Sequence, residues 1–181
     1  MATGSVTTIE QFGMETIDAV SNLVTANRYL QAVVLLYSAI DTLAWADLAS
    51  GDVTRSDFCR WTTAYVNPDS KLGCTAEDLY AARCALLHSA GAASRMTREG
   101  RAAELWYVTS PHSVALLEAR VRETGANAKV LYFTALASAF AEGVMQFNDD
   151  LELDTDRLAR CSERVRLWLR FLPTKLVSER I

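Results

Sequence analysis

Apolar residues recur every three or four positions along most of this chain, which is the pattern of helices that bury one face. The first such segment covers residues 8–24. The second, 27–49, is apolar on almost every side and is followed by Gly51, a residue type that often ends helices. We therefore predict that segment 27–49 is the central helix of a bundle.

Four further segments follow the same pattern: 55–66, 76–89, 126–148 and 155–172. Three threonines each precede an acid by three residues, a spacing that marks helix starts: Thr7 with Glu10, Thr54 with Asp57, and Thr75 with Asp78. Pro68 and Pro173 follow the first and the last of the four segments and forbid their continuation. These signals predict six helices with defined ends.

Residues 104–110 interrupt the helical pattern, because they have the aromatic and β-branched content of a short strand. A strand needs a partner, and residues 114–121 are one candidate, which makes a hairpin. The same residues are good helix formers, so a helix there is equally consistent with the sequence. The prediction is an all-α bundle of about five to six helices, with a short strand or hairpin near 104–121.

The length of 181 residues suits one domain, so we treat residues 1–181 as a single helical domain. Half of the residues are hydrophobic and only three are proline, which is typical of a folded chain with few long loops. The four cysteines form no C-x-x-C pair and stand mostly among apolar residues, so we expect buried thiols without disulfides or zinc.

The N-terminus lacks the basic and apolar regions of a secretory signal, so a cytoplasmic location is expected. The most apolar runs, 32–40 and 130–141, are shorter than the ~18 residues that cross a bilayer. Asp41 and Glu142 end these two runs. We expect no contact with a membrane.

The net charge of −4 excludes a domain that attracts nucleic acid through its overall field. Any site for RNA must be local. Positive charge does gather between residues 83 and 101, where four arginines meet one acid, Glu99: Arg83, Arg95, Arg98 and Arg101. Solvated surface arginines are the alternative interpretation of this cluster.

Arg83 and His88 stand five residues apart at the end of the predicted helix 76–89. An arginine binds a phosphate and a histidine moves protons near neutral pH, so together they can cut RNA without a metal. On an ideal helix the two residues are separated by about 140° around the axis and about 7.5 Å along it. Because they do not share a face, the spacing favours a site built from two copies of the chain.

This R-x4-H pattern on a later helix of an all-α bundle resembles the HEPN superfamily. Asp41, an acid in the apolar helix 27–49, is similar to the polar residue that many HEPN proteins hold near their site. The resemblance implies a homodimer that acts as a metal-independent endoribonuclease, in defence or toxin biology, with no cofactor. It implies attack of an RNA 2′-hydroxyl on the adjacent phosphate, with catalytic roles for Arg83 and His88 and supporting roles for Asp41, Arg95 and Arg98.

Two residues depart from the HEPN pattern. Cys84 follows the arginine where active HEPN nucleases often have a polar residue, and Ala90 stands where HEPN toxins often have a tyrosine. The alternative is therefore an inactive HEPN-like module that binds nucleotide, RNA or a protein partner. A purely structural His88, which caps its helix in a helical adaptor, also stays open, and His112 is expected to be a surface residue.

Overall fold

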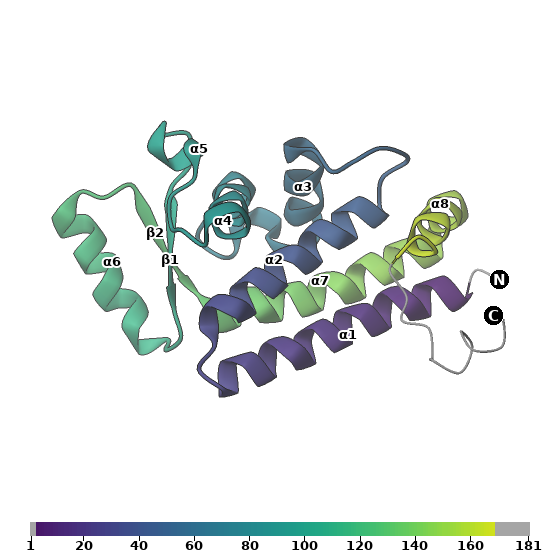
Figure 1. The fold of residues 1–181 in the computed structure, drawn as a ribbon, viewed down its shortest axis with the longest axis horizontal. Helices are drawn as coiled ribbons and strands as arrows, with labels where there is room; N and C mark the ends of the chain where they lie inside the picture. Colours follow the sequence, from purple (N-terminus) through teal and green to yellow (C-terminus); the bar gives the residue numbers. More distant parts are fainter. Residues whose placement is uncertain (1–2, 169–181) are drawn as a thin grey trace, which may run out of the picture.

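The computed structural model describes residues 3–168 (Figure 1). Its elements are, in chain order: α1 (Thr3–Thr25), α2 (Tyr29–Ala46), α3 (Arg55–Trp61), the π-helix η1 (Thr62–Val66), the 3₁₀ turn η2 (Pro68–Ser70), α4 (Ala76–Ser89), α5 (Arg95–Arg98), β1 (Glu104–Val108), α6 (His112–Thr124), β2 (Ala128–Tyr132), α7 (Phe133–Leu153) and α8 (Thr155–Val165). The described chain is mostly helical, as the apolar pattern predicts, and it also contains a small parallel sheet.

Helix α2 is the centre of the bundle. It contacts α1 and α7 on one side and α3 and α4 on the other, and α8 lies near its end (Figure 1). Leu36, Ile40 and Leu43 have no exposed surface, because neighbouring helices cover α2 from several directions. Burial of each such side chain stabilises the fold by roughly 1.5–3 kcal/mol. The prediction of a central helix is confirmed, with shorter bounds than the predicted 27–49.

By length and composition alone, α2 is apolar enough to cross a membrane. The apolar run 32–40 is too short to span a bilayer, and the whole helix reaches the required length only with its flanking residues. Half of the helix is buried inside the fold. Its apolar character is therefore accounted for by the core that it forms with its neighbours.

The sheet consists of β1 and β2, which pair in parallel from Glu104 opposite Ala128 to Val108 opposite Tyr132. The predicted strand near 104–110 is confirmed. Of the two alternatives for 114–121, the helix is confirmed and the hairpin partner is wrong, because these residues lie in α6. Parallel strands need a crossover connection, and α6 provides it at the end of the molecule opposite α8 (Figure 1).

The true partner strand comes from the start of the segment 126–148, which the periodicity assigns to a helix. Helix α7 begins only at Phe133, and residues 128–132 before it form β2. A short apolar run such as 130–132 fits a buried helix and a buried strand equally well by its pattern. Pairing with β1 decides between the two, and this contact lies outside the local sequence.

The helix starts agree with the predicted caps at two of three places. The hydroxyls of Thr54 and Thr75 accept the N–H groups of Asp57 and Asp78, and each acid bonds back to its threonine. Helix α1 begins at Thr3, so the predicted cap at Thr7 is wrong. Helix α8 ends at Val165, and the part of the predicted helix beyond residue 168 lies outside the described residues.

A π-helix, η1, extends α3 toward Pro68. It carries Tyr65, whose ring packs with those of Trp61 and Phe147 at centroid distances of 5.2 Å. The aromatic residues of segment 55–66 therefore belong to the core. Gly143 of α7 lies against the same turn, so close that a Cβ atom there would stand 2.5 Å from the carbonyl oxygen of Tyr65.

We expect Gly143→Ala to lower the free energy of unfolding by about 1–2 kcal/mol in urea titrations. The clash with backbone costs more than the ~1 kcal/mol that alanine contributes to helix propensity. Gly13→Ala is the comparison for a clash with a side chain, because the atoms nearest to its Cβ would be those of Val144 and not backbone. Unchanged stability of Gly143→Ala would contradict the close approach at Tyr65.

The buried carboxylate of Asp78 joins α4 to the sheet. One oxygen accepts the backbone N–H of Ala103 at 2.7 Å, and the other accepts the N–H of Thr75 and the ammonium of Lys129, both at 2.8 Å. Burial alone raises the pKa of this carboxyl, but these bonds outweigh burial and lower it. Asp78 therefore stays ionised and fixes the start of β1 and the middle of β2 relative to α4.

Asp78→Asn should lower the free energy of unfolding at neutral pH by about 1–3 kcal/mol, since it removes a charge-assisted bond to Lys129. Because folding lowers the pKa of Asp78, its ionised carboxylate stabilises the folded protein. This stabilisation is complete above the pKa of the unfolded chain, about 3.9, and is lost as the pH falls through the pKa of the folded protein. The difference between wild type and variant should thus shrink at about pH 3.

Urea unfolding at the two pH values checks this expectation. Asp57→Asn is the control, because Asp57 has the same capping bonds at the start of α3 but no bond to a lysine. A variant difference at Asp78 that does not change with pH would show that its ionisation is not what stabilises the contact.

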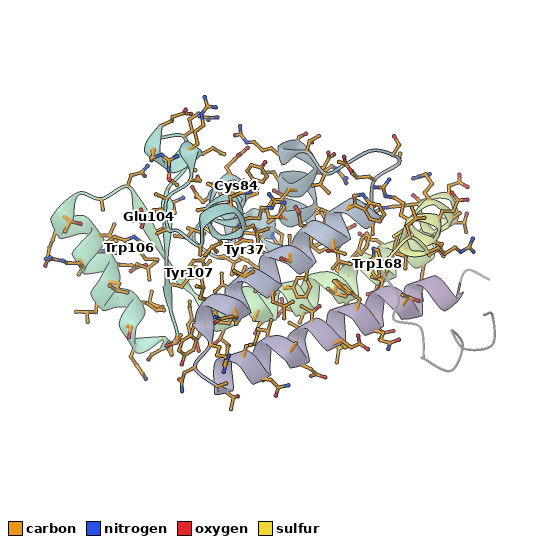
Figure 2. The ribbon with its side chains drawn as sticks, viewed as in Figure 1. Tyr37, Cys84, Glu104, Trp106, Tyr107 and Trp168 are labelled. Carbon is orange, nitrogen blue, oxygen red and sulfur yellow. The ribbon has the colours of Figure 1, made fainter. Side chains whose placement is uncertain are left out.

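A second contact between bundle and sheet joins two tyrosines. The hydroxyls of Tyr37 in α2 and Tyr107 in β1 lie 2.7 Å apart (Figure 2). Burial raises the pKa of both groups, so both stay neutral. The pair therefore holds β1 against α2 without placing a charge in the core.

Candidate functional site

Arg83 projects from α4 toward α2 and forms an ion pair with Asp41. The guanidinium Nη2 lies 2.5 Å from the carboxylate, and the two side chains are 20% and 24% exposed. Burial opposes the charge of the arginine, but the bond to Asp41 outweighs it and raises the pKa of Arg83. Arg83 is therefore a permanent cation held at the protein surface, suited to binding an anion and not to proton transfer.

Arg83 has hydrogen-bonding capacity beyond this pair. A guanidinium carries five N–H donors, and Asp41 engages Nη2. The Nε atom is buried and has no hydrogen-bond partner among the described residues. Because Nε is buried, an acceptor from outside the protein can be bound only through the donors on the η nitrogens.

The ion pair lines an open pocket of about 540 Å³ between α2, α4 and the end of the described chain. The pocket is lined by Asp41, Thr42, Trp45, Asp52, Val53, Arg83, Leu167 and Trp168. Among the described residues that line it, Arg83 is the one cation and stands with two acids, so this lining is not a strongly positive phosphate site in one copy of the chain. Two indole rings give it flat apolar surface.

The two tryptophans are held by different neighbours. The Trp45 ring has the guanidinium of Arg164 at 3.8 Å from its centroid, and the Trp168 ring packs with Phe12 at 4.9 Å. Figure 2 shows Trp168 at the end of the molecule where α8 lies. Trp45 stands four residues after Asp41 on one face of α2, so helix spacing could have revealed it. Nothing in the sequence places Trp168 near Arg83.

His88 lies in the last turn of α4 and is exposed. It is not among the residues that line the pocket of Arg83. The helix ends directly after it, at Ala90, which adopts a left-handed conformation with φ of 49°. The structure therefore agrees with the helical spacing: within one copy, Arg83 and His88 point to different surfaces.

The other arginines of the predicted cluster do not join this pocket. Arg95 is exposed and pairs with Glu99, which also binds Arg101. Arg98 donates to the carbonyl oxygen of Ala93. Helix α5 packs its buried Met96 against Ala81 and Tyr80 of α4. Its arginines are directed to solvent, and none of these side chains lines the pocket of Arg83. His112, at the start of α6, is exposed as expected.

A second polar network near the bundle end escaped the sequence analysis. The buried carboxylate of Asp47 binds Arg60 at 2.9 Å and Arg157 at 2.6 Å. Arg157 also donates to the hydroxyl of Tyr65, which donates to Asp150. Each of these polar groups has a hydrogen-bond partner in the described chain, so the network fastens α8 to α2.

Within residues 3–168, the structure holds no cluster of three or more histidine, cysteine or acidic side chains that could bind a metal ion. Comparisons with protein-family models, curated proteins and solved structures give no match for this chain. The geometry of its own residues is therefore what any functional conclusion must be built on.

The Arg83–Asp41 pair should show a coupling free energy of about 1–2 kcal/mol in a double-mutant cycle of Asp41→Asn and Arg83→Gln. Either single change leaves a half-buried charge without its partner, and the double change removes both charges. Urea unfolding of the four proteins gives the coupling. The exposed pair Arg55–Glu77, of similar length at 2.6 Å, is the control and should couple more weakly.

Proposed function

We propose that two copies of this chain form a metal-independent endoribonuclease site of the HEPN type, in which Arg83 binds the scissile phosphate and His88 transfers the proton. The observation that supports this proposal is that Arg83 and His88 lie on different surfaces of one copy. Arg83 faces the pocket beside α2, while His88 is exposed at the end of α4. A two-fold axis can bring His88 of one copy toward Arg83 of the other.

In the proposed reaction, an RNA 2′-oxygen attacks the adjacent phosphorus and loses its proton to a base. The bond from phosphorus to the 5′-oxygen breaks, and that oxygen takes a proton. His88 serves as the general base or acid, and Arg83 offsets the negative charge that grows on the phosphate oxygens. The products are a 2′,3′-cyclic phosphate and a 5′-hydroxyl.

Asp41 acts as a positioning residue in this scheme. It holds one end of the guanidinium through Nη2 and leaves the remaining donors of Arg83 for phosphate. It also reduces the positive charge that RNA meets, and Asp52 in the same pocket does so further. Assembly of two copies, each contributing an Arg83 and a His88, doubles the number of cations and histidines available to one strand. The proposed setting is the cytoplasm, in defence or toxin biology.

One observation favours the second candidate, an inactive module that binds nucleotide or RNA. Trp45 and Trp168 line the same pocket as Arg83. Aromatic rings beside an arginine are suited to stacking on nucleobases, which needs no histidine. This candidate shares the Arg83 pocket and differs in predicting no cleavage.

Incubation of the protein with mixed-sequence RNA in EDTA separates the two functions. Wild type should produce fragments that end in 2′,3′-cyclic phosphate, and His88→Ala or Arg83→Ala should lower the cleavage rate by about 100-fold or more, as loss of a proton-transfer group or a charge-stabilising donor does. Sedimentation of the wild-type protein tests for the dimer.

His112→Ala and Arg120→Ala are the matched controls, because each removes an exposed side chain of the same type from α6. Both should cleave like wild type. RNA binding without cleavage by any variant, weakened only by Arg83→Ala, would overturn the nuclease and support the binding module. Cleavage that survives loss of His88 would contradict both.

A further inference from the structure

A groove of about 500 Å³ runs along β2 on the side away from β1. It is lined by Lys71, Leu72, Gly73, Val114, Glu118, Val121, Arg122, Ala135 and all five residues of β2. Neighbouring residues of a strand point to opposite faces, so a groove that touches five in succession follows the edge of the strand. Helix α6 forms one wall, and residues 71–73 form the other.

The edge of β2 that faces away from β1 has unpaired backbone groups at its middle residue, Val130, while the amide of Ala128 donates to the carbonyl of Ala126. The amide of Glu104 donates to the carbonyl of Asn127, one residue before its register partner Ala128. In a parallel ladder the bonded residues alternate, so residues 127, 129 and 131 bond to β1. Val130 therefore directs both its N–H and its C=O into the groove, and neither has a partner elsewhere in the described chain.

The side chains of the groove combine apolar walls with available positive charge. Val114, Val121 and Leu72 supply the apolar surface. Arg122 forms no ion pair with a described residue, and Lys71 forms one with Glu142, itself 69% exposed. Such an exposed ion pair contributes little to the stability of the fold, so Lys71 can exchange Glu142 for another carboxylate. Glu118 is the one acid in the lining, so an acidic partner is favoured although the chain as a whole is negative.

We propose that this groove binds an extended acidic segment of a partner protein, which adds to β2 as a third strand. Backbone groups of the segment pair with Val130, and alternate side chains meet the apolar walls and the two cations Lys71 and Arg122. The edge lies between two walls, so a single extended segment can reach it, whereas the edge of a second folded copy is kept away by α6 and residues 71–73. The proposal is independent of the Arg83 pocket.

Val130→Pro tests the backbone pairing directly. Proline removes the N–H that faces the groove and leaves every bond between β1 and β2 in place. A fluorescent synthetic peptide of alternating glutamate and valine should bind wild type and Val130→Ala alike. It should bind Val130→Pro at least about tenfold more weakly, because a hydrogen bond is lost and the ring occupies the edge.

Arg122→Glu tests the charge. This variant should lose affinity for the glutamate peptide and gain affinity for a lysine–valine peptide of the same length. A glutamate peptide with N-methyl groups on alternate amides should not bind wild type, which tests the added strand without any change to the protein. If circular dichroism shows that Val130→Pro does not fold, the comparison of the methylated and unmodified peptides on wild type tests the added strand instead.

The proposal is overturned if the glutamate peptide fails to bind wild type, or if the methylated and unmodified peptides bind equally. Equal binding of the glutamate and lysine peptides would also overturn it. A dimer of the free protein that Val130→Pro dissociates would assign the edge to a second copy of this chain and reject a separate partner.

Discussion

The carboxylate of Asp78 is the contact on which the arrangement of this protein depends. It closes the first turn of α4 and also binds the entry to β1 and a lysine of β2. Burying this charge is favourable only because each bond is made, so the three elements must come together as one unit. Helix α4 carries Arg83 and His88, and β2 carries the open edge. One buried acid thus fixes the geometry of both candidate sites.

The Arg83 pocket and the β2 groove use charge in opposite ways. In the pocket, an acid half-buried with the arginine sets the direction of the guanidinium and lowers the net attraction for phosphate. In the groove, the cation Lys129 is committed to Asp78, Lys71 forms an exposed pair with Glu142, and Arg122 has no ion-pair partner among the described residues. Binding in the pocket therefore depends on the fixed direction of the Arg83 guanidinium. Binding in the groove depends on backbone pairing, and its charges determine which segments are accepted.

The sequence predicted those features whose cause is local. The bounds of α4 follow from Thr75 and Asp78 at its start, and Asp41 stands out in the sequence as an acid within an apolar helix. The start of β2 could not be predicted, since its pattern fits two structures and its partner strand lies beyond α6. The place of Trp168 beside Arg83 depends on how α8 packs. The outward direction of the α5 arginines depends on the geometry of its loop, which composition does not encode.

The parallel sheet also bears on how the chain folds. Glu104 pairs with Ala128, so the whole of α6 lies in the loop that must be ordered before the first bond between strands forms. A hairpin would have closed the sheet through a short turn. Closing the longer loop costs more chain entropy before any contact compensates for it, and pairings of this kind form slowly. Pairing of β2 with β1, and with it the bond of Lys129 to Asp78, therefore depends on the ordering of α6.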